Sequence, residues 1–139
     1  MWLLDTNVVS EMVALKPTVR VMSRISELSR DALFTTAITE AEIFYGIERL
    51  PTGRRCNDLR AAIEDVFSKD LGGRVLAFDS RAARIYGQLL AERRSAGRPI
   101  SQSDVQIAAI AIAHEATLVT RNTRDFANSG IALLNPWLV

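Results

Sequence analysis

The sequence predicts an α/β fold in which a parallel central sheet of four to five strands is sandwiched between helices. Short apolar runs alternate along the chain with longer segments of helical spacing. The runs are continuously apolar, which is typical of strands that are covered on both faces. The chain has 139 residues, of which 48% are hydrophobic, and no linker or repeat divides it. We therefore expect one domain over residues 1–139.

The first half of the chain contains two expected strands and four expected helices. Pro17 suits the first turn of the second helix, Thr39 opens the third, and Gly72 with Gly73 ends the fourth. Each strand is thus followed by helices, as a parallel sheet requires. The strands are expected over residues 2–4 and 32–36, and the helices over residues 7–14, 17–30, 39–50 and 54–68.

The second half continues the alternation. Asp79 is placed to cap a helix that Gly97 and Pro99 end. A polar loop that contains Asn122 and Asp125 joins the last two strands. The strands are expected over residues 75–78, 117–120 and 131–134, and the helices over residues 80–95 and 103–115.

Four acidic residues fall where such a sheet would bind a ligand. Asp5 closes the first strand, Glu42 lies in the first turn after the second strand, and Asp125 follows the fourth. Asp104 lies in the first turn of a helix. Ligands of open parallel sheets bind outside the carboxyl ends of the strands. The four carboxylates can thus meet in one crevice, although the sequence alone does not give the strand order.

A cluster of carboxylates needs protons or a cation. Two bare carboxylates about 4 Å apart repel by roughly 4 kcal/mol at an effective dielectric constant near 20. Ligand sets made only of oxygen suit Mg²⁺ or Mn²⁺, which keep several waters and bind phosphate oxygens of a substrate. The chemistry that follows from such a site is phosphodiester hydrolysis by a metal-activated water.

The same acids have structural interpretations that the residues leave open. Asp5 with Thr6 and Asn7 is also good turn chemistry after a strand. Glu42 could complete a capping box with Thr39, since Thr-x-x-Glu has that spacing. Asp104 could be an acid favoured by the dipole of its helix.

Composition excludes several other classes of protein. The formal net charge of +1 argues against a strongly basic polyanion binder. Cys56 is the single cysteine, which excludes an intramolecular disulfide and fits a reducing cytoplasm. His114 is the single histidine and no Gly-x-Ser-x-Gly motif is present, which argues against Ser-His-Asp hydrolysis. We expect neither a signal peptide nor a membrane-spanning segment.

Four short motifs occur in order along the whole chain. They are Leu3 to Ser10, Ile38 to Ile43 with Gly46, Ser103 to Ala109 and Leu118 to Phe126, followed by Asn135-Pro136-Trp137 at the end. Together they resemble the motifs of PIN-domain nucleases, and in particular those of the VapC and FitB toxins of bacterial toxin-antitoxin operons. Any one of these strings is weak, but the set in order is specific.

The resemblance implies a Mg²⁺- or Mn²⁺-dependent endoribonuclease. It implies that Asp5 and Asp104 are direct metal ligands, and that Glu42 and Asp125 complete the pocket directly or through water. It also implies that four polar residues orient waters or phosphate: Thr6, Asn7, Thr120 and Asn122. Some relatives of the family carry aspartate at the position of Asn122, and others carry asparagine there with the acid three residues later, as in this chain with Asp125.

The resemblance also implies partners. These are an RNA substrate, a second copy of the chain in a homodimer, and a small antitoxin whose tail occupies the active site. The antitoxin would carry the DNA-binding domain, so operator DNA would be bound only through it. The arginines at 54, 55, 81, 84, 93 and 94 could line an RNA path, contact the partner or lie on solvated helix faces. The alternative function is a catalytically silent member of the fold that only binds its antitoxin.

Overall fold

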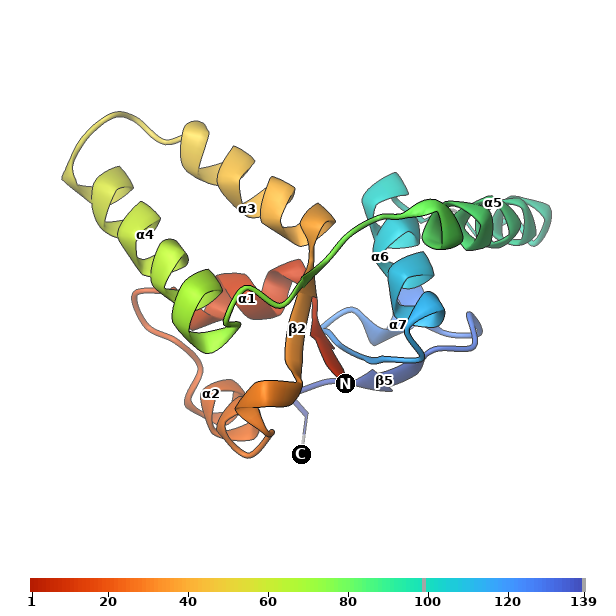
Figure 1. The fold of residues 1–139 in the computed structure, drawn as a ribbon, viewed down its shortest axis with the longest axis horizontal. Coiled ribbons are helices and arrows are strands. Elements are labelled where there is room, and N and C mark those ends of the chain that lie inside the picture. Colours follow the sequence, from red (N-terminus) through yellow and green to blue (C-terminus); the bar gives the residue numbers. More distant parts are fainter. Residues whose placement is uncertain (99, 139) are drawn as a thin grey trace.

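The computed structural model describes residues 1–98 and 100–138, and its centre is a five-stranded sheet (Figure 1). All the strand pairs are parallel, which confirms the expected sheet. The spatial order is β3-β2-β1-β4-β5. The strands are β1 (Trp2–Leu4), β2 (Leu33–Thr36), β3 (Val75–Leu76), β4 (Thr117–Val119) and β5 (Ala132–Leu134).

Helices connect the strands and cover both faces of the sheet. Two irregular turns join them, a 3₁₀ turn at Arg30–Ala32 and a π turn at Val66–Asp70. The α-helices are α1 (Thr6–Met12), α2 (Val19–Ser26), α3 (Ala37–Glu48), α4 (Arg54–Asp65), α5 (Ser80–Ser95), α6 (Gln102–Ala113) and α7 (Thr123–Phe126). None of the described helices is long and apolar enough to cross a membrane.

The two faces of the sheet pack into two separate cores. Successive residues of a strand point to opposite faces, so Leu4 packs with α1 to α4 while Leu3 packs with α5 and α6. Val119 and Leu118 on β4 divide in the same way. Figure 1 shows the α3–α4 hairpin on one side of the sheet and α5 with α6 on the other. Burial on both faces explains why the strands are continuously apolar.

The strand order places β1 and β4 side by side where the winding of the sheet changes direction. The chain builds the sheet outward from β1 through β2 to β3, then returns to the other side of β1 to add β4 and β5. The direction of winding therefore reverses between β1 and β4, and ligands of such sheets bind at the carboxyl ends of the strands beside this reversal. Asp5 and Thr120 are the residues that directly follow these two strands.

The structure corrects several predicted boundaries. Pro17 lies outside α2, because Thr18 is the extended residue before that helix and its N–H donates to the Glu11 carboxylate at 2.6 Å. The helix then ends at Ser26 rather than at Arg30. The third strand ends at Leu76, before the expected residue 78. The predicted polar loop between the last two strands contains the one-turn helix α7.

The start of α3 is the correction that matters for the site. Thr39 was expected at the N-cap, but the N-cap is Thr36, whose hydroxyl accepts a hydrogen bond from the Thr39 N–H at 3.0 Å. Either threonine can cap a helix, and the helix begins at the first one because nothing in Ala37 or Ile38 opposes it. Thr39 is therefore inside the helix, and Glu42 lies in its second turn instead of its first.

The long helix α5 begins and ends close to its predicted limits. Asp79 is its N-cap and accepts a hydrogen bond from the Ala82 N–H at 3.0 Å, as expected. Gly97 follows the helix with a φ of 65°, a conformation that favours glycine. The predicted role of Pro99 lies outside the described residues.

Candidate active site

Asp5 is the most buried of the four predicted acids, with 3% of its surface exposed. It follows β1 and is the N-cap of α1, so its carboxylate has a local structural role in addition to any role in a metal site. One carboxylate oxygen accepts the Thr6 N–H at 2.8 Å, and the other accepts the Thr120 hydroxyl at 2.7 Å. Because Thr120 follows β4, this second bond joins the two strands at the reversal of the sheet.

Polar groups from the first and fourth motifs surround this bond. The Asn7 amide nitrogen lies 3.5 Å from Asp5 Oδ2 and 3.4 Å from Thr120 Oγ1. The Arg121 N–H donates to the Asn7 side-chain oxygen at 3.2 Å. Asn122 joins the network through its backbone N–H, which donates to Thr120 Oγ1 at 3.1 Å. These hydrogen bonds fix the side-chain conformation of Asp5. That the same residues also orient water or phosphate stays a prediction.

The side chain of Glu42 is held by a hydrogen bond from α1 rather than by a capping bond within its own helix. Its Oε1 accepts the Thr6 hydroxyl at 2.8 Å. The same hydroxyl lies 3.1 Å from the hydroxyl of Thr39. The capping-box interpretation of Glu42 is wrong, because Thr36 caps the helix. Thr6 thus contacts both acids, Asp5 through its backbone N–H and Glu42 through its side chain.

Asp104 and Asp125 lie on the other side of the sheet reversal. Asp104 is in the first turn of α6, half-buried, and its N–H donates to the N-cap Ser101 at 3.2 Å, as the helix-dipole interpretation expects. Asp125 lies on α7 and is exposed. The Arg93 guanidinium donates to the Asp125 backbone carbonyl, and the Asp125 N–H donates to the Asn122 carbonyl at 3.0 Å.

The electrostatics show that these acids influence one another. Burial raises the pKa of the Asp5 carboxyl to about 6, against hydrogen bonds from Thr120 and Thr6 that lower it. The negative charges of Asp104 and Glu42 raise the pKa of Asp5 further. Burial also raises the pKa of Asp104, a hydrogen bond from Ser101 lowers it, and Asp125 raises it. Ion pairs within residues 1–98 and 100–138 involve none of these acids.

Asp5 is influenced by Glu42 and Asp104, and Asp104 by Asp125, but the described structure does not place these acids as a closed set of ligands. Within the described part of the chain, no three acidic, histidine or cysteine side chains lie close enough to hold one metal ion together. The donors nevertheless fit Mg²⁺ or Mn²⁺, because all are oxygens and the buried Asp5 has no basic partner among the described ion pairs. Mg²⁺ commonly binds through one or two carboxylates and keeps several waters.

Sequence reasoning missed three residues that support the site. The sequence predicts Thr39 as a helix cap, leaves Arg93 open between an RNA path, a partner contact and a solvated helix face, and gives no role to Ser101. Ser101 has a local signal, because Ser-x-x-Asp before an apolar helix is a capping pattern. Thr39 and Arg93 have no such signal, because their partners lie 33 and 32 residues away in the sequence.

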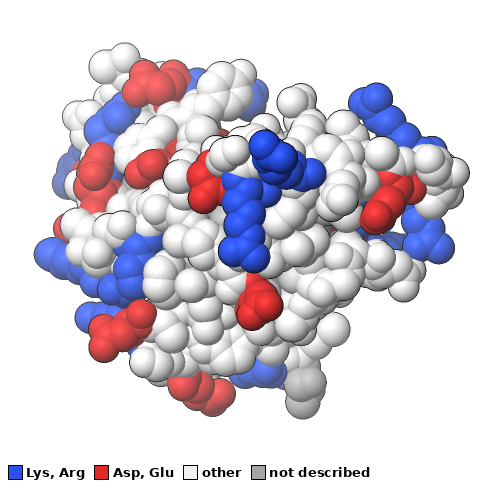
Figure 2. Space-filling model, turned by 45° about the vertical axis from the view of Figure 1, so that its right-hand side comes forward, with Lys and Arg blue, Asp and Glu red and all other residues white. Residues whose placement is uncertain are grey.

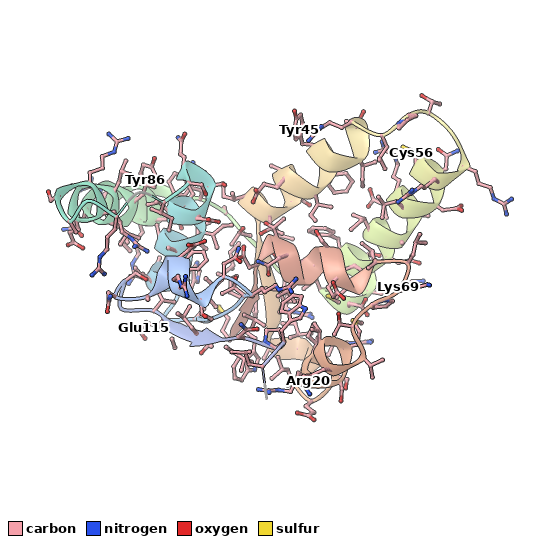
Figure 3. All side chains as sticks on the ribbon, turned by 180° about the vertical axis from the view of Figure 1, so that it is seen from behind. Arg20, Tyr45, Cys56, Lys69, Tyr86 and Glu115 are labelled. Carbon is pink, nitrogen blue, oxygen red and sulfur yellow. The ribbon has the colours of Figure 1, made fainter. Side chains whose placement is uncertain are left out.

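An apolar groove leads away from Glu42. It has a volume of about 870 Å³ and lies between α1, α3 and α4, with Thr6 and Glu42 at its edge. Figure 3 shows α3 and α4 as the two arms of a hairpin, with Tyr45 projecting away from it. Leu15, whose surface is 87% exposed, lies on the rim. The floor and walls are mostly aliphatic, among them Val13, Ile43, Ile47, Leu50, Leu59 and Ile63.

The chain matches a known family over most of its length. The family model described as PIN domain matches residues 2–130. The chain belongs to the PIN domain family. This confirms the resemblance predicted from the four motifs, and the PIN fold accounts for the parallel sheet with helices on both faces.

Similar proteins of the PIN family cover nearly the whole chain. The VapC ribonuclease Y4jK of Sinorhizobium fredii is 37% identical over 137 residues, which are 99% of this chain and 98% of that protein. The toxin FitB of Neisseria gonorrhoeae is 36% identical over 137 residues, 99% of each chain. A solved structure of FitAB bound to an IR36 DNA fragment matches with a TM-score of 0.92 and 36% identity, over 100% of this chain and 97% of that one.

Proposed function

We propose that this PIN-domain chain, residues 1–139 as one domain, is a Mg²⁺- or Mn²⁺-dependent endoribonuclease and the toxin of a type II toxin-antitoxin pair. The observation that carries the proposal is Asp5, a buried carboxylate at the reversal of the sheet that two other acids make harder to ionise. A cation would relieve this charge. The relatives named a VapC ribonuclease and a toxin support the activity.

The residues of the site would have two kinds of role, holding the cation and keeping its ligands in position. Asp5 and Asp104 would hold the cation, with Glu42 and Asp125 bound directly or through water. When bound there, a divalent cation lowers the pKa of a water and neutralises charge at the scissile phosphate. Thr120 and the Thr6 N–H keep the Asp5 oxygens in position, and the Thr6 hydroxyl does the same for Glu42. Preorganised ligands of this kind lose little free energy to reorientation during the reaction.

The charge distribution fits a substrate that is recognised locally rather than by a broad basic field. Figure 2 shows basic and acidic side chains intermingled on the face it presents. The net charge of +1 agrees with this view. We therefore expect RNA binding to depend on contacts near the acids and to have only a modest dependence on salt.

The direct test is RNA cleavage by the purified, antitoxin-free protein. We expect cleavage with Mg²⁺ or Mn²⁺, none with EDTA, and recovery when the metal is restored; the products are followed by gel electrophoresis and end-mapping on total RNA. Metal-independent cleavage would contradict the metal role. Absence of cleavage on every RNA, together with tight binding of the antitoxin, would favour the catalytically silent alternative.

The groove beside Glu42 suits the partner protein. Its aliphatic lining would bury an apolar segment, and its edge at Thr6 and Glu42 lies beside the acids. We propose that the antitoxin places an apolar helix here and its tail over the acids, which would inhibit cleavage. The FitAB structure, which contains DNA, supports a protein partner and operator DNA bound through it. The same proposal includes a homodimer that meets its RNA in the cytoplasm.

A bulky residue in the groove should separate antitoxin binding from cleavage. Gly46 lines the groove, and a Cβ added there would meet no atom within 4 Å. We expect Gly46→Phe to weaken antitoxin binding at least about tenfold, a difference of about 1.4 kcal/mol, measured by calorimetry, while RNA cleavage persists. The matched control is Gly87→Phe, an equally open helical glycine on α5. Equal binding by both variants would place the antitoxin elsewhere.

A further inference from the structure

Thr39 is a fully buried threonine that no part of the proposed chemistry yet uses. Its exposed surface is 0%, and it lies in α3, beside Thr6, which is the first residue of α1. Its backbone N–H donates to Thr36, as any residue at this point of a capped helix would do. Its hydroxyl lies 3.1 Å from the Thr6 hydroxyl, and the geometry of that pair permits either one to donate.

The number of hydroxyl protons fixes the direction of the hydrogen bond between Thr6 and Thr39. A threonine hydroxyl has one proton and two lone pairs, and an ionised carboxylate only accepts. Thr6 donates its one proton to Glu42 Oε1 at 2.8 Å. Thr6 can therefore only accept from Thr39, so the chain of donors runs from Thr39 to Thr6 to Glu42. The result does not depend on seeing hydrogen atoms.

We propose that Thr39 is a positioning residue that sets the direction of the Thr6 hydroxyl and, through it, the placement of Glu42. This rests on the proposed function, since it assigns Glu42 to the metal pocket. Thr6 connects two of the acids, because its hydroxyl donates to Glu42 and its N–H donates to Asp5. Thr39 therefore acts on the residue that contacts two of the acids at once.

Burial makes this role stronger than an exposed hydroxyl could have. Water has little access to Thr39, so no solvent molecule readily replaces its proton if the hydroxyl is removed. Thr6 would then lose a donor and gain rotational freedom. Bonds in such a chain also polarise one another, so the contact between Thr6 and Glu42 weakens when the first donor is lost. In helices, threonine hydroxyls commonly bond back to the carbonyl of residue i−4; here the hydroxyl reaches α1 instead.

The test is a double-mutant cycle on Mn²⁺ binding, followed by the electron paramagnetic resonance signal of free Mn²⁺. We expect Thr39→Val to weaken Mn²⁺ binding about 10-fold, the lower end for an outer partner of a metal ligand. In a Glu42→Gln background the same change should have less than about a twofold effect, since coupled residues are not additive. Thr39→Ser, which keeps the hydroxyl, should bind Mn²⁺ as the wild type does.

The chain provides a matched control in Thr35. Its hydroxyl is equally buried and donates to the Leu4 carbonyl at 2.8 Å, and among the described residues it has no hydrogen bond to an acid. Thr35→Val should lower the free energy of unfolding but leave Mn²⁺ affinity unchanged. If Thr39→Val weakens Mn²⁺ binding equally with and without Glu42, or no more than Thr35→Val does, then Thr39 serves packing alone and the proposal is wrong.

A second readout separates this proposal from the proposed function. In a crystal structure of Thr39→Val without metal, we expect Glu42 to have left the Thr6 hydroxyl, whereas Thr39→Ser retains the contact. An unchanged Glu42 in Thr39→Val would overturn the positioning role even if the enzyme cleaves RNA. Conversely, if Glu42 is displaced in Thr39→Val but the wild type binds no Mn²⁺, the positioning role of Thr39 is supported and the metal site is rejected. Thr39→Ala replaces Thr39→Val in all measurements if the valine variant does not fold.

Discussion

Replacing Asp5 with asparagine is expected to reduce RNA cleavage by more than about 100-fold, since losing even an outer partner of a metal ligand costs about 10- to 100-fold. Asparagine can still accept the Thr6 N–H, so α1 keeps its N-cap. The variant loses the negative charge that would hold the cation. Initial rates on one defined RNA, at equal protein and metal concentrations, measure the effect.

The matched control for Asp5→Asn is Asp79→Asn. Asp79 also caps a helix, at the start of α5, and asparagine is an equally good cap. We expect Asp79→Asn to retain wild-type cleavage. Circular dichroism of both variants checks that they are folded. Equal cleavage by Asp5→Asn and wild type would remove Asp5 from the site and, with it, the central part of the proposed mechanism.

Asp5 is also expected to lower the stability of the metal-free protein as the pH rises. Burial raises its pKa from 3.8 in the unfolded reference to about 6 in the fold. Between these values the folded protein binds more protons than the unfolded chain, so the free energy of unfolding falls as the pH rises. The shift corresponds to about 3 kcal/mol, at about 1.4 kcal/mol per pKa unit. The loss is complete above the folded pKa.

Comparison with Asp5→Asn isolates this contribution from the other titrating groups. Urea unfolding at about pH 4 and about pH 7 should show that the wild type loses about 2.4 kcal/mol more than the variant, because part of the total of about 3 kcal/mol is already lost at pH 4. Mn²⁺ at about 100 times its dissociation constant should restore about 2.7 kcal/mol to the wild type at the higher pH, and much less to the variant. If the free energy of unfolding changes with pH equally in the two proteins, then burial does not raise the pKa of Asp5 in the fold.

Much of the fold was predictable because its signals are local. The apolar runs that became β1, β2, β4 and β5 and the Asp79 cap of α5 involve residues next to one another in the chain. The predicted strand limits near Trp2 and Leu134 are correct to within a residue or two. Errors arose where two local patterns compete, as for Thr36 and Thr39, either of which can cap α3.

The site was predictable only in part, for the same reason. Asp5 and Asp104 could be placed at the end of a strand and the start of a helix, and the structure finds them there. The capping pattern suggested the wrong partner for Glu42, because its real partner, the Thr6 hydroxyl, lies 36 residues away. No rule of local spacing could have chosen between them.

The amino-acid pattern was enough to predict the alternation of strands and helices, the parallel sheet, the positions of the acids along these elements and, through the four motifs, the family. The strand order could not be predicted in this way, nor could the meeting of Asp5 and Thr120, which are 115 residues apart. The same holds for Thr6, which joins Asp5 to Glu42. Caps and periodicity arise from neighbours in the chain, whereas the direction of a buried hydroxyl depends on which distant group packs against it.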